Sequence, residues 1–358
     1  MRSVNYIICL CAIFFLGACN KKTIQIHGHI DPVLDLNGRV VELVMSDGDE
    51  ERNFYTQIED NKFSFKKHFK NEHLAVLSID DFGDFTICVE HGKVDLTYFP
   101  IDSISLLDNE NTAMVSMLGT PNNNIINTYN SLEYNAFSQI AAASSDEQVS
   151  AIMARWVEQS YNLVIDNVNS IGAAYIITYI YSYLTTPQKD IIFRQLDLGS
   201  FSDSKMCDML STLVDYYHAE KQSAVGQRFL DFEVVNRNSE VHKISEYIGK
   251  TDYVLIDFWA TWCAPCLRLM PSLGLLHNKY NSSRQLQVIS VSLDDSSEEW
   301  SEFLSSNSEY DWLQFFPLSD SIPLKYAVTS IPNTILIDKN GIIVAKNPDM
   351  DSLEVFFK

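Results

Sequence analysis

Val254-Leu-Ile-Asp-Phe-Trp-Ala-Thr-Trp-Cys-Ala-Pro-Cys266 joins a short apolar run to a pair of closely spaced cysteines. Its first part, Val254 to Phe258, is a short apolar run of the kind that forms a buried strand. Two cysteines separated by two residues follow, and the Pro265 between them suits the first turn of a helix, where a missing N–H is not needed. The stretch therefore predicts a buried strand that leads into a helix, with Cys263 at the helix N-terminus.

The two cysteines fit redox chemistry. Unpaired N–H groups give a helix N-terminus a partial positive charge, which stabilises a thiolate and lowers the pKa of Cys263. Cys263 is thus expected to be the exposed nucleophile, and Cys266, one helical turn further on, its buried disulfide partner. A structural zinc site would need a second pair of ligands, whereas the nearest histidine, His277, stands alone. Zinc and an inert disulfide remain the alternatives.

The stretch resembles the active-site segment of thioredoxin-fold proteins, and its flanks resemble the TlpA/ResA-type thiol–disulfide oxidoreductases, which are related to the peroxiredoxins. The resemblance covers the C-terminal third of the chain. It includes Val225-Gly-Gln-Arg-Phe-Leu-Asp-Phe232, where Leu230 replaces a proline that is common in the family. The resemblance implies an α/β thioredoxin-like fold whose redox group is a Cys263–Cys266 disulfide, with no metal and no organic cofactor.

Asp257 is a carboxylate in an otherwise apolar strand. Burial would raise its pKa, so that it could exchange a proton with a buried thiol through water. Thioredoxin has an acid at the matching position, whereas many TlpA/ResA-type proteins have an asparagine there. The alternative is a carboxylate at a strand edge in contact with solvent.

Ser330-Ile-Pro-Asn-Thr334 precedes another apolar strand. The family resemblance implies a cis peptide bond before Pro332 that faces the two cysteines. The backbone of Ile331 would then be free to pair with an extended substrate peptide. Trp262, together with Trp259, is expected to form a wall of this substrate site.

The first residues form a processing signal. Arg2 gives a positive start, residues 6–16 are apolar, and Leu16-Gly-Ala-Cys19 follows. This last motif resembles the bacterial lipobox, which implies cleavage before Cys19 and a lipid anchor on it. The protein would then lie in the bacterial cell envelope, lipid-anchored and facing the periplasm. Ordinary secretion with cleavage nearby is the alternative.

The remaining cysteines are expected to be free. Cys9 and Cys11 leave with the signal, and Cys19 carries lipid. Cys88 lies in an apolar strand pattern and Cys207 in a helical one, so both are interpreted as buried thiols. A Cys88–Cys207 bridge is the alternative, because the envelope permits disulfides.

The chain, with 358 residues of which 46% are hydrophobic, is long enough for several domains. Its net charge of −21 argues against binding to nucleic acid or docking on anionic lipid. Short alternating runs separated by turn residues predict a β-sandwich, which resembles one often found before TlpA-like domains. Helical spacing follows from about residue 124 to 220. The predicted ranges are a signal peptide (1–18), a sandwich (19–118), a helical domain (119–222) and a redox domain (223–358).

The redox domain is expected to contain parallel strands with helical crossovers and a terminal antiparallel hairpin. Asp294-Asp295-Ser296 would cap one helix, and a final helix would begin at Asp351. The resulting fold class is multidomain: an all-β sandwich, a central α-helical segment and a thioredoxin-like α/β domain.

The predicted function is the reduction of protein disulfides. Cys263 attacks a substrate disulfide, and Cys266, deprotonated with help from Asp257, resolves the mixed disulfide. A membrane thiol donor re-reduces the pair. Three alternatives stay open: a disulfide oxidase or isomerase, a thiol peroxidase, although peroxiredoxins resemble a Thr-x-x-Cys pattern, and a binding protein whose redox domain is a passenger.

Overall fold

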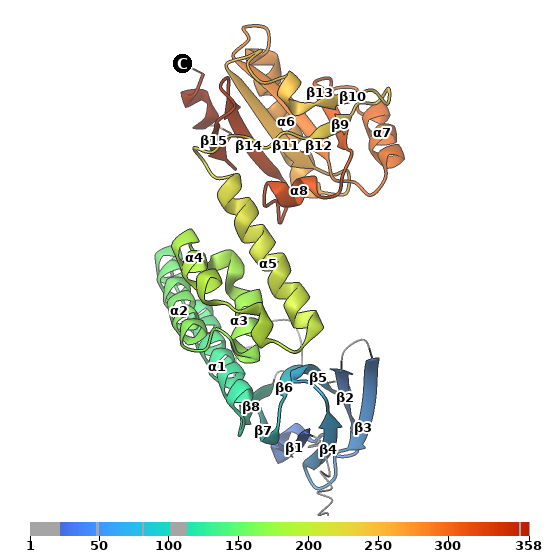
Figure 1. Cartoon of the computed structure of the whole chain (residues 1–358), viewed down its shortest axis with the longest axis vertical. Helices are drawn as coiled ribbons and strands as arrows, with labels where there is room; N and C mark the ends of the chain where they lie inside the picture. Colours follow the sequence, from blue (N-terminus) through green and yellow to red (C-terminus); the bar gives the residue numbers. More distant parts are fainter. Residues whose placement is uncertain (1–21, 48–49, 81, 101–112, 351, 358) are drawn as a thin grey trace, which may run out of the picture. The chain divides into compact units, whose positions relative to one another are not determined.

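A computed structural model describes residues 22–47, 50–80, 82–100, 113–350 and 352–357 (Figure 1). The chain divides into two compact units, Met1–Leu210 and Ser211–Lys358, and each is described by itself. Cys19 and the rest of the predicted signal lie outside the described residues.

The first unit contains two four-stranded sheets. One has the order β4-β1-β7-β8, with β1 (Lys22–Ile30), β4 (Lys62–Phe69), β7 (Gly92–Pro100) and β8 (Ala113–Leu118). The other has the order β3-β2-β5-β6, with β2 (Val40–Asp47), β3 (Glu50–Gln57), β5 (His73–Ile79) and β6 (Gly83–Val89). Alternate side chains of both sheets, such as Ile26 and Leu43, are buried in one shared core. This arrangement confirms the expected sandwich.

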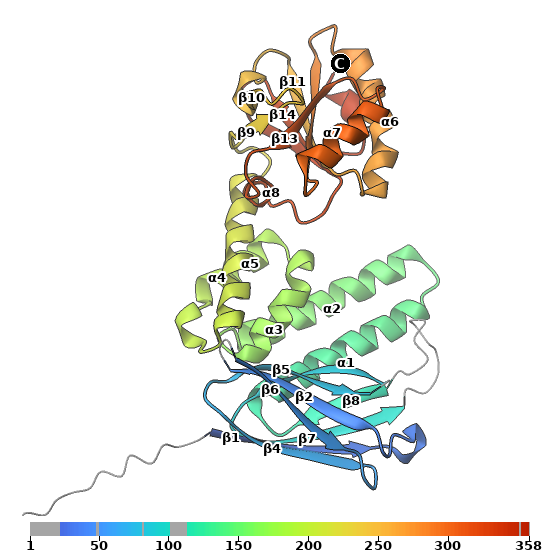
Figure 2. The same ribbon diagram turned by 90° about the vertical axis from the view of Figure 1, so that its right-hand side faces the viewer.

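Five helices follow β8: α1 (Pro121–Ala141), α2 (Asp146–Asp166), α3 (Ile171–Ile180), α4 (Thr186–Gln195) and α5 (Ser204–Gln222), which crosses the division between the units. The first two lie side by side (Figure 2). Buried Glu90 accepts hydrogen bonds from the backbone N–H groups of Asn122 and Asn123 and so caps α1. Ile126 and Ile171 join the sandwich core, so the helical segment shares a core with the sheets. The sequence-based domain ranges stay a prediction.

The second unit is built on a seven-stranded sheet with the order β10-β9-β13-β12-β11-β14-β15 (Figure 1). Its strands are β9 (Glu233–Val235), β10 (Val241–Lys243), β11 (Tyr253–Trp259), β12 (Leu286–Ser292), β13 (Leu313–Pro317), β14 (Asn333–Asp338) and β15 (Ile343–Lys346). The strands β11, β12 and β13 are parallel, and β14 and β15 run antiparallel. The expected mixed sheet is confirmed.

Strand β11 lies inside this sheet and is buried on both faces. Ile256 and Phe258 belong to one core, whereas Leu255 and Trp259 belong to the other, because successive side chains of a strand point to opposite faces. The helices of this unit are α6 (Ala264–Tyr280), α7 (Ser297–Ser306) and α8 (Ile322–Lys325). Ser296 caps α7 by accepting a hydrogen bond from the N–H of Glu299, as expected.

Two details of this unit differ from the sequence analysis. Strand β13 was not predicted, because its five residues include a glutamine and end in proline, so they show no clear alternation. The expected C-terminal helix is only a 3₁₀ turn, Ser352–Val355. Leu353 within this turn and Phe357 after it are both buried.

Candidate active site

The two cysteines of the opening motif form a disulfide at the N-terminus of α6. Cys263 is the N-cap residue, and its sulfur accepts a hydrogen bond from the N–H of Cys266 (3.2 Å). The Cα atoms are 5.2 Å apart. Pro265 lies in the first turn, where it leaves no helical hydrogen bond unmade. The predicted strand, turn and helix therefore occur in the expected order.

Both cysteine side chains are almost completely buried in this disulfide form. Cys263 is 4% exposed and Cys266 is 2% exposed. The prediction of an exposed Cys263 is wrong for this form, because the two sulfurs pack into the same core as Trp259 and Met270. In the disulfide form, solvent therefore reaches Cys263 hardly more than it reaches Cys266, although Cys263 lies at the helix N-cap.

Asp294 holds the turn that precedes Cys263. The backbone N–H and the hydroxyl of Thr261 both donate to its Oδ1 atom, at 2.9 and 2.7 Å. The hydroxyl of Ser292 donates to Oδ2 at 2.6 Å. The sequence analysis assigned Asp294 only to the start of a helix and missed this contact. The only sign of this contact in the sequence is the hydroxyl of Thr261, two positions before Cys263, and a single hydroxyl residue does not identify its partner.

Asp257 lies on β11 and is 1% exposed, so the alternative of a solvent-exposed strand edge is wrong. The hydroxyl of Ser290 on β12 donates to its Oδ2 atom at 3.1 Å, and no described residue bonds to Oδ1. Burial raises the pKa of Asp257 to about 7, and the hydrogen bond from Ser290 partly opposes that rise. The carboxyl group can therefore accept or release a proton near neutral pH.

The residues expected to bind substrate lie in different environments. Trp262 is 66% exposed and is available to a partner. Trp259 is fully buried against Phe303 and does not form a wall open to substrate. The peptide bond between Ile331 and Pro332 is cis, and both residues are half-buried. Ile331 packs against the core that contains both cysteines and also against the core on the other face of the sheet.

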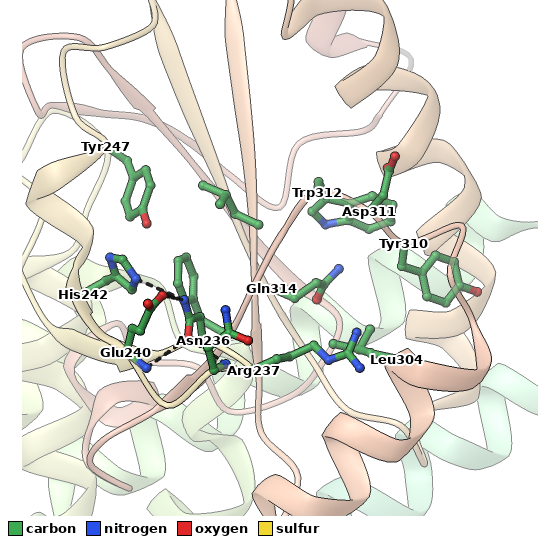
Figure 3. A pocket seen from close by; sticks show the side chains of 13 residues that line it. Asn236, Arg237, Glu240, His242, Tyr247, Leu304, Tyr310, Asp311, Trp312 and Gln314 are labelled. Atoms are coloured by element: carbon green, nitrogen blue, oxygen red, sulfur yellow. Dashed lines mark hydrogen bonds between the residues drawn. The ribbon is translucent and has the colours of Figure 1, made fainter.

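A separate cavity of about 370 Å³ lies beside the β9–β10 hairpin and the first half of β13 (Figure 3). Neither cysteine lines it. Its walls include Asn236 and His242 from the hairpin side and Tyr310, Trp312 and Gln314 from the β13 side. The sequence analysis did not anticipate it, because its lining comes from segments far apart in the chain.

The other cysteines and histidines show no second site among the described residues. Cys88 is a buried free thiol, as expected, and Cys207 is a free thiol that is only half-buried. No group of three or more His, Cys, Asp or Glu side chains in the described part of the chain could hold a metal ion. No helix of the described residues is long and apolar enough to cross a membrane.

A thioredoxin-like family model matches residues 250–343, which contain β11, both cysteines and the cis proline. The thiol-disulfide oxidoreductase ResA of Geobacillus kaustophilus (strain HTA426) is 31% identical over 138 residues, covering 36% of this chain and 73% of the relative. The chain belongs to the ResA family of thiol-disulfide oxidoreductases. The thioredoxin-like protein YneN of Bacillus subtilis (strain 168) is 32% identical over 120 residues, or 33% of this chain and 68% of that protein.

Solved structures match the same third of the chain. The thioredoxin domain of a thiol-disulfide oxidoreductase from Bacteroides vulgatus is 25% identical, with a TM-score of 0.35 and coverage of 38% of this chain and 99% of that one. A thiol:disulfide interchange protein from a Bacteroides species is 25% identical, with a TM-score of 0.35 and coverage of 37% and 90%.

Membership of the ResA family makes this chain an oxidoreductase enzyme of thiol–disulfide chemistry. The N-terminal unit lies outside the matched region.

Proposed function

We propose that this ResA-family protein reduces protein disulfides by a Cys263–Cys266 dithiol/disulfide cycle in the bacterial cell envelope. The observation that carries the proposal is the disulfide at the N-terminus of α6, with the buried carboxyl of Asp257 on the strand that leads to it. The helix N-terminus favours a Cys263 thiolate, and a carboxyl group that titrates near neutral pH suits proton exchange with a buried thiol.

The reaction has two steps. The Cys263 thiolate attacks one sulfur of a substrate disulfide, so that a mixed disulfide forms and the other substrate sulfur leaves as a thiolate. Cys266 then gives its proton to Asp257 and attacks the Cys263 sulfur, which releases the second substrate thiolate and closes the enzyme disulfide. Two electrons pass from the enzyme to the substrate. A membrane thiol donor returns them.

Substrate binding is assigned to the exposed Trp262 and to the loop at Ile331 and Pro332. Trp262 offers a large apolar surface, and the loop packs against the core that holds the disulfide. An extended segment of the substrate would pair with the backbone of Ile331, as in strand addition. No metal or organic cofactor takes part in this mechanism, because the disulfide itself carries the electrons.

A trapped intermediate tests the mechanism. In a Cys266→Ser variant the mixed disulfide on Cys263 cannot be resolved, so substrate proteins should stay bound to the variant on a non-reducing gel and be released by reductant. Cys207→Ser is the matched control, because it removes a half-buried thiol in the other unit. Trapping by the control but not by Cys266→Ser would contradict the assignment.

The envelope location is a separate proposal that depends on Leu16-Gly-Ala-Cys19. A lipid on Cys19 would hold the redox unit at the membrane, beside a thiol donor. Cys19→Ala should leave the protein unprocessed or release it in soluble form. If the variant kept its size and its membrane fractionation, the anchor would lie elsewhere.

A further inference from the structure

The hydrogen bonds around the ionised Asp257 carboxylate run in one direction. The indole N–H of Trp312 donates to the hydroxyl oxygen of Ser290 at 2.9 Å, and an indole N–H has no lone pair with which to accept. The hydroxyl hydrogen of Ser290 is therefore turned away from Trp312 and toward Oδ2 of Asp257, 3.1 Å away. All three side chains are buried, so water does not compete with this chain of donors.

We infer that Ser290 and Trp312 are positioning residues, which fix the Asp257 carboxyl so that Oδ1 is the atom that receives the Cys266 proton. This inference rests on the proposed two-step function. Oδ2 already accepts the Ser290 hydrogen, whereas no described residue bonds to the buried Oδ1. Protonation of Oδ2 would force the Ser290 hydroxyl to turn and to lose its acceptor, which costs about 1–3 kcal/mol for a buried group.

The same geometry prevents the Asp257 proton from leaving through Ser290 to Trp312. Trp312 cannot accept a proton from Ser290, so the chain of hydrogen bonds from Trp312 through Ser290 to Asp257, here called the relay, ends at the indole ring. Leu255 and Trp259 share a face of β11 with Asp257 and belong to the core that holds both cysteines, so the carboxyl lies on the side of the sheet where the thiols lie.

A direct titration of Asp257 in the oxidised full-length protein tests the relay. The titration midpoint, measured from the carboxyl ¹³C shift, should rise by about 1 in Ser290→Ala, because a hydrogen bond to a charged acceptor is lost. Trp312→Phe keeps a ring but frees the Ser290 hydroxyl, and the midpoint should rise by less. Gln314→Leu changes the neighbour of Ser290 on β13 and should leave the midpoint unchanged.

The pH dependence of turnover provides the second readout, and its inflection should move in the same order among the variants. Unchanged midpoints in both Ser290→Ala and Trp312→Phe would overturn the relay itself. Midpoints that shift while the turnover profile stays fixed would overturn the role of the relay in catalysis. If Asp257→Asn turned over as fast as the natural protein at every pH, the proposed function itself would fail.

Discussion

The buried Asp257 should make the redox unit less stable as the pH rises, and Asp257→Asn removes this effect. Burial raises the pKa of Asp257 to about 7 in the folded protein from its ordinary value of 3.8, a difference of about 3.2. At 1.36 kcal/mol for each pKa unit, this difference corresponds to about 4 kcal/mol. Because the group is almost completely buried, solvent screening does not reduce this figure much.

The sign follows from proton binding. Between about pH 4 and pH 7 the folded protein holds a proton on Asp257 that the unfolded chain has already released, so the free energy of unfolding falls as the pH rises. An asparagine has no such proton. The stability of Asp257→Asn relative to the natural protein should therefore increase by about 4 kcal/mol from about pH 4 to about pH 8, whatever constant offset the amide introduces.

Urea unfolding of the oxidised full-length protein measures this gap. Four of the five tryptophans, at positions 259, 262, 300 and 312, lie in the second unit, so tryptophan fluorescence reports mainly on that unit. Asp295→Asn, an exposed change in the loop before α7, is the control and should show a nearly constant gap. If the gap for Asp257→Asn were equally constant across this pH range, the reasoning from burial to proton affinity would be refuted.

Three further predictions concern catalysis. Asp257→Asn should slow turnover by about 10²-fold or more and remove the inflection near neutral pH in the rate profile, because Cys266 loses its proton acceptor; an unchanged profile would exclude that role. Asp294→Ala should destabilise the oxidised protein by about 1–3 kcal/mol and lower turnover, because Thr261 loses its acceptor before Cys263; thermal unfolding and steady-state rates measure both effects. Equilibration with glutathione should give a potential nearer −270 mV than about −120 mV, because an ionised Asp257 opposes a second negative charge; a value more oxidising than about −180 mV would make the protein an oxidase or isomerase.

Much of the redox unit was predictable from the sequence because its signals are local. The apolar run before Cys263, the proline in the first turn and the Ser296 cap each depend on a few neighbouring residues. The burial of Asp257 was also predictable, since every neighbour on its strand is apolar. These features require no knowledge of distant contacts.

The contacts that refine the site were not predictable, because they join residues far apart in the chain. Trp312 and Ser290 are 22 residues apart, and Ser290 and Asp257 are 33 apart. Thr261 and Asp294 are likewise joined only by the fold. Strand β13, which brings Gln314 beside Ser290, is too short and irregular to be recognised by alternation. The shared core of the sandwich and the helices was not predictable for the same reason, since an apolar face does not show which other element it packs against.

Reduction of insulin disulfides by the full-length protein shows whether the Cys263–Cys266 pair turns over. With dithiothreitol as the electron donor, the natural protein and Cys207→Ser should accelerate insulin reduction equally, and Cys263→Ser should reduce insulin no faster than dithiothreitol alone. Turnover by Cys263→Ser at the natural rate, or no acceleration by the natural protein, would contradict the account.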